Sequence, residues 1–128
     1  MAKPAKYGLA SVQRRTDEAT KLLLIAAEIE KGRQARTLVP YLPLARLTGL
    51  FSGGAPLARL LGTLFEMDVE AGWAPRTALV VHHTNGVFGE PGGGFFKLCE
   101  KHRMLPPDAA PEMRTQVWER LRDEVWAG

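Results

Sequence analysis

Glycines and prolines divide residues 16–72 into three segments with the apolar spacing of helices, and this division constrains the fold more than any other feature. Acids follow Thr16 at the start of the first segment, where they suit the positive end of a helix. Pro56 opens the third segment, a position that loses no needed N–H, and Gly49 ends the second. The predicted helices cover about residues 16–31, 41–48 and 56–71.

The second and third predicted helices have the spacing of a helix-turn-helix motif, and a hairpin follows them. Residues 76–82 are the best strand candidate, Asn85-Gly86 favours a tight turn, and Val87-Phe88 can form the returning strand. Three helices followed by a hairpin make a winged helix, a fold that reads DNA with its third helix. We therefore predict an α+β, mostly helical fold, a winged helix-turn-helix with extra N- and C-terminal helices.

The two ends of the chain extend this predicted core. Residues 1–15 are predicted to form a basic, poorly ordered arm, which leaves residues 16–128 as a single domain. Residues 95–104 and 111–126 are predicted to be helical, and the second of these places apolar side chains at a spacing of four.

The glycine-rich stretch 85–96 has three interpretations: a phosphate cradle at a helix N-terminus, the wing of a DNA-binding domain, or a long hairpin turn. Lys97 comes too late for a nucleotide-binding loop, and no Gly-Lys-Ser/Thr element follows. The position of the stretch after the predicted strand favours the wing, with Phe95 and Phe96 turned into the core. Whether its glycines approach DNA phosphate or only their own domain stays open.

Positive charge is concentrated in the first half of the chain. The net charge is +3, but residues 1–36 hold eight Lys or Arg residues against four acids, and residues 37–65 hold no acid. A basic first half is typical of proteins that bind polyanions, although a solvated basic surface gives the same composition. The candidates for phosphate contacts in this region are Arg14, Arg15, Arg33 and Arg36.

Three short motifs in the middle of the chain resemble those of the alkylguanine-DNA alkyltransferases and their non-catalytic alkyltransferase-like relatives. Residues 41–45 (Tyr-Leu-Pro-Leu-Ala) are similar to the family's T-Y-G-x-[IL]-A segment. Residues 58–62 (Ala-Arg-Leu-Leu-Gly) are similar to A-R-A-V-G on its recognition helix. Val80-Val81, with residues 86–93, resembles its V-V…G-x-x-G-x-Y-x-G-G wing. The resemblance covers roughly residues 32–100 and keeps the order of the family's elements.

The resemblance implies roles for the matched residues. Arg59 would correspond to the arginine that enters the base stack and fills the gap left by a flipped nucleotide. Tyr41 would correspond to the tyrosine that crowds the phosphate and helps to rotate the nucleotide out. Ala58 and Gly62 would let the third helix lie close to the minor groove. The predicted DNA-binding set also includes Arg46, Thr63, Gly92 and Gly93.

The family's alkyl acceptor is missing from this sequence. Its P-C-H-R-V motif would fall on residues 76–80, which contain neither the cysteine nor the histidine that activates it as a thiolate. Cys99, the single cysteine, lies beyond the predicted wing. The resemblance therefore implies a DNA-binding shell, able to flip a base, without alkyl transfer.

Metal and cofactor sites find little support in the sequence. His82 and His83 are neighbours on a predicted strand and point to opposite faces, so they make a poor pair for one metal. Cys99 and His102 share a face of a predicted helix, but no fourth ligand presents itself. We predict no cofactor, and metal binding by these last two residues stays open.

The three tryptophans are predicted to be core or interface residues, with base stacking as the alternative. Trp118 and Trp126 lie eight residues apart on the last predicted helix, while Trp73 follows the third. A helix of this kind packs on its own domain or on a second copy, so the sequence offers a homodimer through Trp118 and Trp126 as a further partner.

These features together predict a non-catalytic DNA-binding protein with a role in repair or regulation. The alternative is a protein-interaction or dimerisation module of the same fold, and a third interpretation is a metal-dependent or nucleotide-binding enzyme. No apolar window reaches the length of a membrane span, and residues 1–11 lack the apolar region of a secretion signal. We therefore expect a cytoplasmic protein with no membrane partner.

Overall fold

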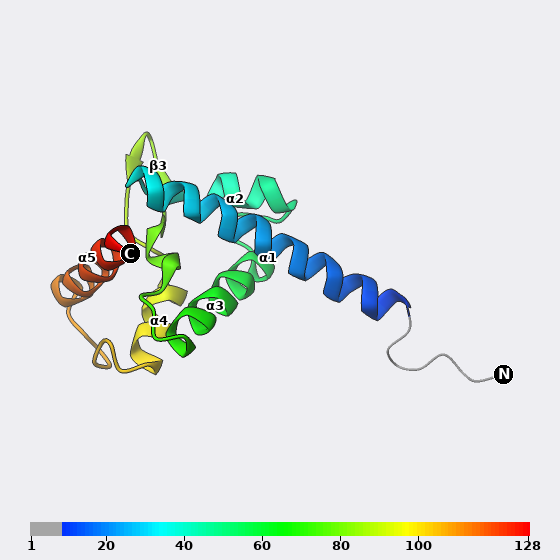
Figure 1. Cartoon of the computed structure of the whole chain (residues 1–128). Coiled ribbons are helices and arrows are strands. Elements are labelled where there is room, and N and C mark those ends of the chain that lie inside the picture. The colour runs from blue at the N-terminus through cyan, green and yellow to red at the C-terminus, as the bar shows by residue number, and fades with distance from the viewer. Residues whose placement is uncertain (1–8) are drawn as a thin grey trace.

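The computed structural model describes the chain from residue 9 to residue 128 and shows a mostly helical α+β fold (Figure 1). The predicted fold class is confirmed at this level. In chain order the elements are α1 (Leu9–Ala35), β1 (Val39–Pro40), α2 (Tyr41–Thr48), α3 (Ala55–Glu70), the 3-10 helix η1 (Arg76–Leu79), β2 (Val80–Val81), β3 (His83–Thr84), β4 (Val87–Phe88), α4 (Gly93–Lys101) and α5 (Pro111–Ala127).

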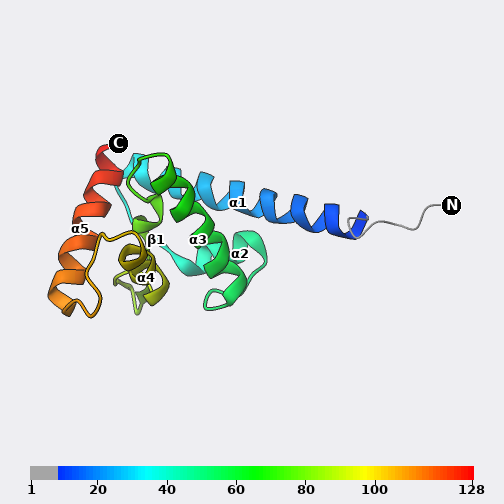
Figure 2. The ribbon, with the colours of Figure 1, turned by 90° about the horizontal axis from the view of Figure 1, so that it is seen from below.

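Helix α1 is longer than predicted at both ends. It begins at Leu9, so residues 9–15 belong to the helix and not to an arm, while residues 1–8 of the predicted arm lie outside the described residues. Its N-terminal half extends away from the other elements, as Figures 1 and 2 show. Its C-terminal half packs on α2 and α3 through Ile25 and Ile29, which are fully buried.

Gly32 does not end α1, as the sequence predicted, but lies inside it. A Cβ atom at this position would come within 2.7 Å of Val39 Cγ2, so the glycine allows β1 to pass close to the helix. The helix ends at Arg36, which adopts a left-handed φ of 53°, and the N–H of Thr37 donates to the Gly32 carbonyl.

Helices α2 and α3 follow one another in the predicted order, with a turn between them. Helix α2 ends at Gly49, whose φ of 72° is the left-handed conformation that glycine adopts at helix C-termini. Helix α3 follows the turn, with Gly54 at its N-cap and Pro56 in its first turn. Gly72, with a φ of 80°, follows the end of α3 where the sequence predicted its stop.

The predicted strand over residues 76–82 is mostly wrong. Residues Arg76–Leu79 form η1, and only Val80 and Val81 are in a strand. Asp68 causes the difference, because its carboxylate accepts hydrogen bonds from both the backbone N–H and the side chain of Arg76, and this holds the segment against the end of α3. Val80 then pairs in parallel with Val39, which joins β2 to β1.

The predicted turn at Asn85-Gly86 and the returning strand Val87-Phe88 are confirmed, but the strand that pairs with it is His83–Thr84 and not residues 76–82. Strands β3 and β4 pair antiparallel, with His83 opposite Phe88. Asn85 and Gly86 both have positive φ angles, of 52° and 77°, which is the conformation of the tight turn that this dipeptide favours. The N–H of His82 donates to the Glu90 carbonyl at 3.0 Å and continues the pairing beyond the two strands.

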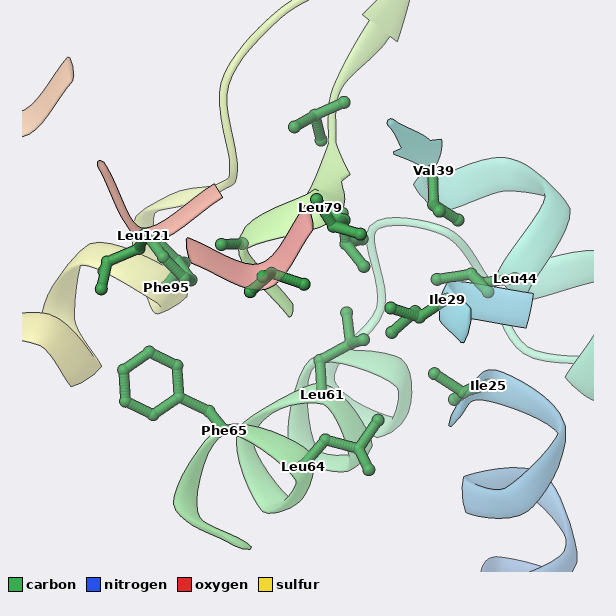
Figure 3. Packing of buried hydrophobic residues seen from close by; sticks show 14 of the residues in the cluster. Ile25, Ile29, Val39, Leu44, Leu61, Leu64, Phe65, Leu79, Phe95 and Leu121 are labelled. Atoms are coloured by element: carbon green, nitrogen blue, oxygen red, sulfur yellow. The ribbon is translucent and has the colours of Figure 1, made fainter. Parts of the chain in front are cut away.

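A single cluster of buried apolar side chains connects the helices, as Figure 3 shows. Leu64 and Phe65 of α3 contribute to it together with Leu79 and, from α5, Leu121. Helix α5 covers the side of η1, and the indole N–H of Trp118 donates to the Ala78 carbonyl at 2.8 Å. This bond satisfies a backbone acceptor that an extended strand would have paired with a neighbour.

Replacing Asp68 tests how far the fold depends on its carboxylate. The side chain is 1% exposed and meets Arg76 Nη2 at 2.6 Å, so Asp68→Asn leaves the guanidinium without its counter-charge. We expect a loss of about 3 kcal/mol in the free energy of unfolding, measured by urea denaturation. Glu70→Gln removes an exposed acid two residues away and serves as the matched control. Equal unfolding midpoints for the two variants would contradict this account.

Candidate functional site

A pocket of about 670 Å³ lies between the α2–α3 turn, helix α3 and the start of α4. Tyr41 from the start of α2 and Gly53 and Gly54 from the turn form one side, and Gly92–Gly94 form the other. Arg59 lines the pocket from α3. The α2–α3 turn, helix α3 and the glycine-rich start of α4 therefore form one concave site, which is the usual shape of a ligand site.

Tyr41 connects the two sides of the pocket. Its hydroxyl oxygen accepts a hydrogen bond of 2.8 Å from the backbone N–H of Gly92, and its ring lies 5.0 Å from the ring of His82. A Cβ atom on Gly92 would come within 3.3 Å of the Tyr41 hydroxyl, so glycine permits the contact. Burial raises the pKa of Tyr41 above 10.0, and the Gly92 hydrogen bond opposes this shift, so the phenol is neutral at physiological pH.

Arg59 is the cation of the pocket. Its side chain is 67% exposed, and its Nη2 atom lies 3.7 Å from an Oε1 atom of Glu18 on α1. An ion pair between two exposed side chains at this distance is weak, because water screens both charges. Arg59 is therefore available to a stronger anion.

Thr77 occupies the position at which the family resemblance calls for the acceptor cysteine. It is 5% exposed, lines the pocket, and its hydroxyl has no hydrogen-bond partner among the residues that the structure describes. No aspartate, glutamate, asparagine or glutamine lines the pocket. His82 also lines the pocket, but no hydrogen bond joins its ring to the Thr77 hydroxyl in the part of the chain that the structure describes.

Two acids near the end of α3, Asp68 and Glu66, are bonded to other residues of the domain. Asp68 is held by Arg76, and Glu66 accepts hydrogen bonds from Lys101 at 3.0 Å and from His102 at 2.9 Å. The hydrogen bond from Lys101, supported by His102, lowers the pKa of Glu66. The part of α3 before Glu66 contains no acidic residue.

The structure brings four of the sequence-predicted site residues together: Tyr41, Arg59, Gly92 and Gly93 all line the pocket. Gly93 is also the first residue of α4, which begins two residues earlier than predicted. Phe95 and Phe96 are buried, at 8% and 7% exposure, as predicted.

The remaining predicted residues lie outside the pocket. Arg46 and Thr63 are exposed on α2 and α3, and the Thr63 hydroxyl donates to the Arg59 carbonyl. Arg15 is exposed on α1, and the side chain of Arg14 lies outside the described residues. Arg36 is exposed at the opposite end of α1.

Arg33 belongs to a second cavity, of about 500 Å³, which shares no lining residue with the first. Its Nε atom bonds to Glu30 at 2.6 Å, and the Asp68–Arg76 pair and Trp73 line the same cavity. The charges on both arginines of this cavity are therefore already matched within the domain.

Cys99 and His102 do not form a metal site. Cys99 is completely buried, and His102 bonds to Glu66. Within residues 9–128, no three His, Cys, Asp or Glu side chains lie close enough together to hold a metal ion. The rings of His82 and His83 have separate partners, Tyr41 and Phe88, as their predicted opposite orientations imply.

The two tryptophans of α5 serve the fold. Trp118 is 7% exposed and Trp126 is partly buried, and the indole N–H of Trp126 donates to the Thr37 carbonyl at 3.2 Å. The guanidinium of Arg122 lies 5.2 Å and 5.1 Å from the two indole rings, a cation–π arrangement that holds it between them. The dimer through these residues stays a prediction. Trp73, in contrast, is 64% exposed.

Sequence reasoning missed several residues at the pocket. His82 lines the pocket beside Tyr41, a position that the sequence did not indicate. Gly53 and Gly54 also line the pocket. Gly54, two residues before Pro56, indicates a helix N-terminus without a side-chain cap. Phe51, next to the lining residue Ser52, is 87% exposed, which its apolar side chain did not lead us to expect.

Comparisons with known protein families, with curated proteins and with solved structures find no match for this chain. The site is therefore interpreted from its own geometry. None of the helices in residues 9–128 has an apolar stretch long enough to cross a bilayer.

The Cys99 thiol is fully buried in α4 and offers a test of the packing around this helix. Burial raises its pKa to about 12, so it holds almost no thiolate at about pH 8 and should resist alkylation in the folded protein. Iodoacetamide labelling followed by mass spectrometry should be slow under native conditions and rapid in concentrated guanidinium chloride. Fast labelling of the native protein would show an accessible thiolate and contradict this assignment.

Proposed function

We propose that the chain is a non-catalytic DNA-binding protein that contacts the duplex with α3 and the β3–β4 hairpin and accepts an extrahelical nucleotide in the adjoining pocket. The observation that carries the proposal is the position of Arg59, an exposed cation at the edge of a pocket formed by the helix-turn-helix segment and the glycine-rich segment. Enzymes and binders that extract a base need both a probe at the helix surface and a pocket beside it.

The shape of α3 supports this docking. Ala58 and Gly62 flank Arg59 on the exposed side of the helix, and such small residues permit a close approach to a groove. The helix is 16 residues long, sufficient to span a groove of DNA. The acids of α3 lie beyond this surface, from Glu66 onward. Glu66, the nearest of them, is bonded to Lys101 of α4.

The charge distribution supports backbone contacts. Arg46 on α2 and Arg15 on α1 are exposed, and residues 37–65 contain no acid. Contacts with backbone phosphates supply most of the affinity of such complexes. They weaken at high salt because the release of counterions from DNA then gains less entropy. Binding should therefore decrease steeply with ionic strength.

The pocket itself suits a nucleotide. Leu57, Leu61 and Phe95 give it an apolar wall, while the Tyr41 hydroxyl and the Thr77 hydroxyl supply polar groups. Planar bases are commonly held between such apolar faces and a few directed hydrogen bonds. Because the Thr77 hydroxyl has no hydrogen-bonded base among the described residues, we expect the nucleotide to be bound without being modified.

Fluorescence anisotropy with a labelled duplex tests the proposal. Arg59→Gln should weaken binding about tenfold or more at moderate salt, because it removes the charge at the pocket edge. Arg33→Gln is the matched control and should leave binding nearly unchanged, since Arg33 is bonded to Glu30 at the second cavity. Equal effects of the two substitutions would refute the role of α3, and no binding at low salt would refute the function.

Glu18→Gln should act in the opposite direction. Glu18 lies 3.7 Å from Arg59 and competes with DNA phosphate for it, so its neutralisation should raise affinity roughly two- to fivefold. The same anisotropy titration measures this change. A decrease in affinity would mean that Glu18 positions Arg59 instead of competing for it.

A further inference from the structure

Two helix N-termini meet at the 670 Å³ pocket. Helix α3 begins after Gly54 and helix α4 after Gly92, and neither N-cap residue provides a side-chain hydrogen bond. Neither helix has an acid in its first turn. The first N–H groups of a helix have no acceptor within it and carry the positive end of its dipole. Both positive ends are therefore available to one ligand.

The backbone at the start of α4 is left with free donors. The N–H of Gly92 donates to Tyr41 and that of Phe95 to the Gly92 carbonyl, whereas no described residue accepts a hydrogen bond from Gly93 or Gly94. Both of these glycines are exposed and line the pocket. No side chain stands between their N–H groups and an approaching ligand.

The Thr77 hydroxyl is an independent indication of a ligand. It is buried, lines the same pocket and has no partner among the described residues. A buried hydroxyl is almost always paired, so an unpaired one at a pocket wall calls for an acceptor from outside the chain. The protein supplies no carboxylate or side-chain amide there to serve as that acceptor.

The polar groups of the pocket are mainly donors. Arg59 provides a permanent positive charge, and the Tyr41 hydroxyl, which accepts from Gly92, still has its own proton to donate. Ser52, which is exposed, adds a further hydroxyl. A ligand that satisfies several donors and two helix dipoles must present a group of negatively charged oxygens, and phosphate does so best.

We propose that this pocket binds the phosphate group of a nucleotide unit, with the base against the apolar wall of Leu57, Leu61 and Phe95. The phosphate belongs either to a DNA strand, in which case the inference rests on the proposed function, or to a free mononucleotide. In both cases the N–H groups at the starts of α3 and α4 and the Thr77 hydroxyl hold it.

Nuclear magnetic resonance of the ¹⁵N-labelled full chain tests the site without DNA. Three probes are added at constant ionic strength: inorganic phosphate, a deoxynucleoside 5′-monophosphate and the corresponding deoxynucleoside. The two phosphate-containing probes should shift the amide resonances of Gly53, Gly54, Gly93 and Gly94, and the deoxynucleoside should not. Shifts absent from these four glycines, or spread over exposed arginines such as Arg36, would overturn the proposal.

Two matched substitutions separate the pocket hydroxyl from an exposed one. Thr77→Val should weaken binding of the monophosphate about tenfold or more, the loss expected for one hydrogen bond to a charged group. Thr63→Val should have no effect, because that hydroxyl already donates to the Arg59 carbonyl on the surface of α3. Thermal unfolding provides the second readout: Thr77→Val removes an unpaired buried hydroxyl and should not lower the melting temperature. A stable Thr77→Val protein with unchanged binding would refute the role of Thr77.

The outcome for DNA is separable from the outcome for phosphate. Glycine shifts with the monophosphate, together with no binding to duplex DNA, would support the phosphate pocket and refute the proposed function. Arg59-dependent DNA binding without any glycine shift would refute the phosphate pocket and leave the proposed function standing.

Discussion

The contact between Asp68 and Arg76 is the constraint on which the rest of the structure depends. A carboxylate that is 1% exposed at the end of α3 accepts both the side chain and the backbone N–H of Arg76. This turns the chain into η1 instead of a strand, and it places Thr77 at the wall of the pocket and Val80 beside β1. A buried ion pair of this kind adds little net stability, but breaking it leaves a charge without a partner, so it acts mainly to select one path for the chain.

Helix α5 and the start of α2 complete the arrangement from opposite sides. Trp118 of α5 satisfies the Ala78 carbonyl, which η1 leaves without a strand partner. On the other side, the Tyr41 hydroxyl holds the backbone of Gly92 and so sets the distance between the helix-turn-helix segment and the glycine-rich segment. Leu61 and Phe95 belong both to the lining of the pocket and to the apolar core (Figure 3).

The proposed function rests on what the pocket contains. Its donors are peptide N–H groups, hydroxyls and Arg59, and no carboxylate lines it. This lining suits the anionic group that we propose it binds.

Much of the local structure was predictable from the sequence, because it depends on neighbouring residues. Gly49 and Gly72 end helices through their left-handed conformations, and the turn at Asn85 follows from the same preference. Tyr41, Arg59 and the glycines of the site were identified as candidates from short motifs. The boundaries of α1, the conversion of the predicted strand into η1, and the convergence of two helix ends were not predictable. They depend on Asp68 meeting Arg76 and on the packing of distant elements, which no local pattern encodes. The sequence by itself determined where most of the helices lie and where the chain turns at Gly49, Gly72 and Asn85, because these choices are local. Only the tertiary structure decided that residues 76–79 form η1 and that Thr77 lies at the wall of a pocket without a partner among the described residues.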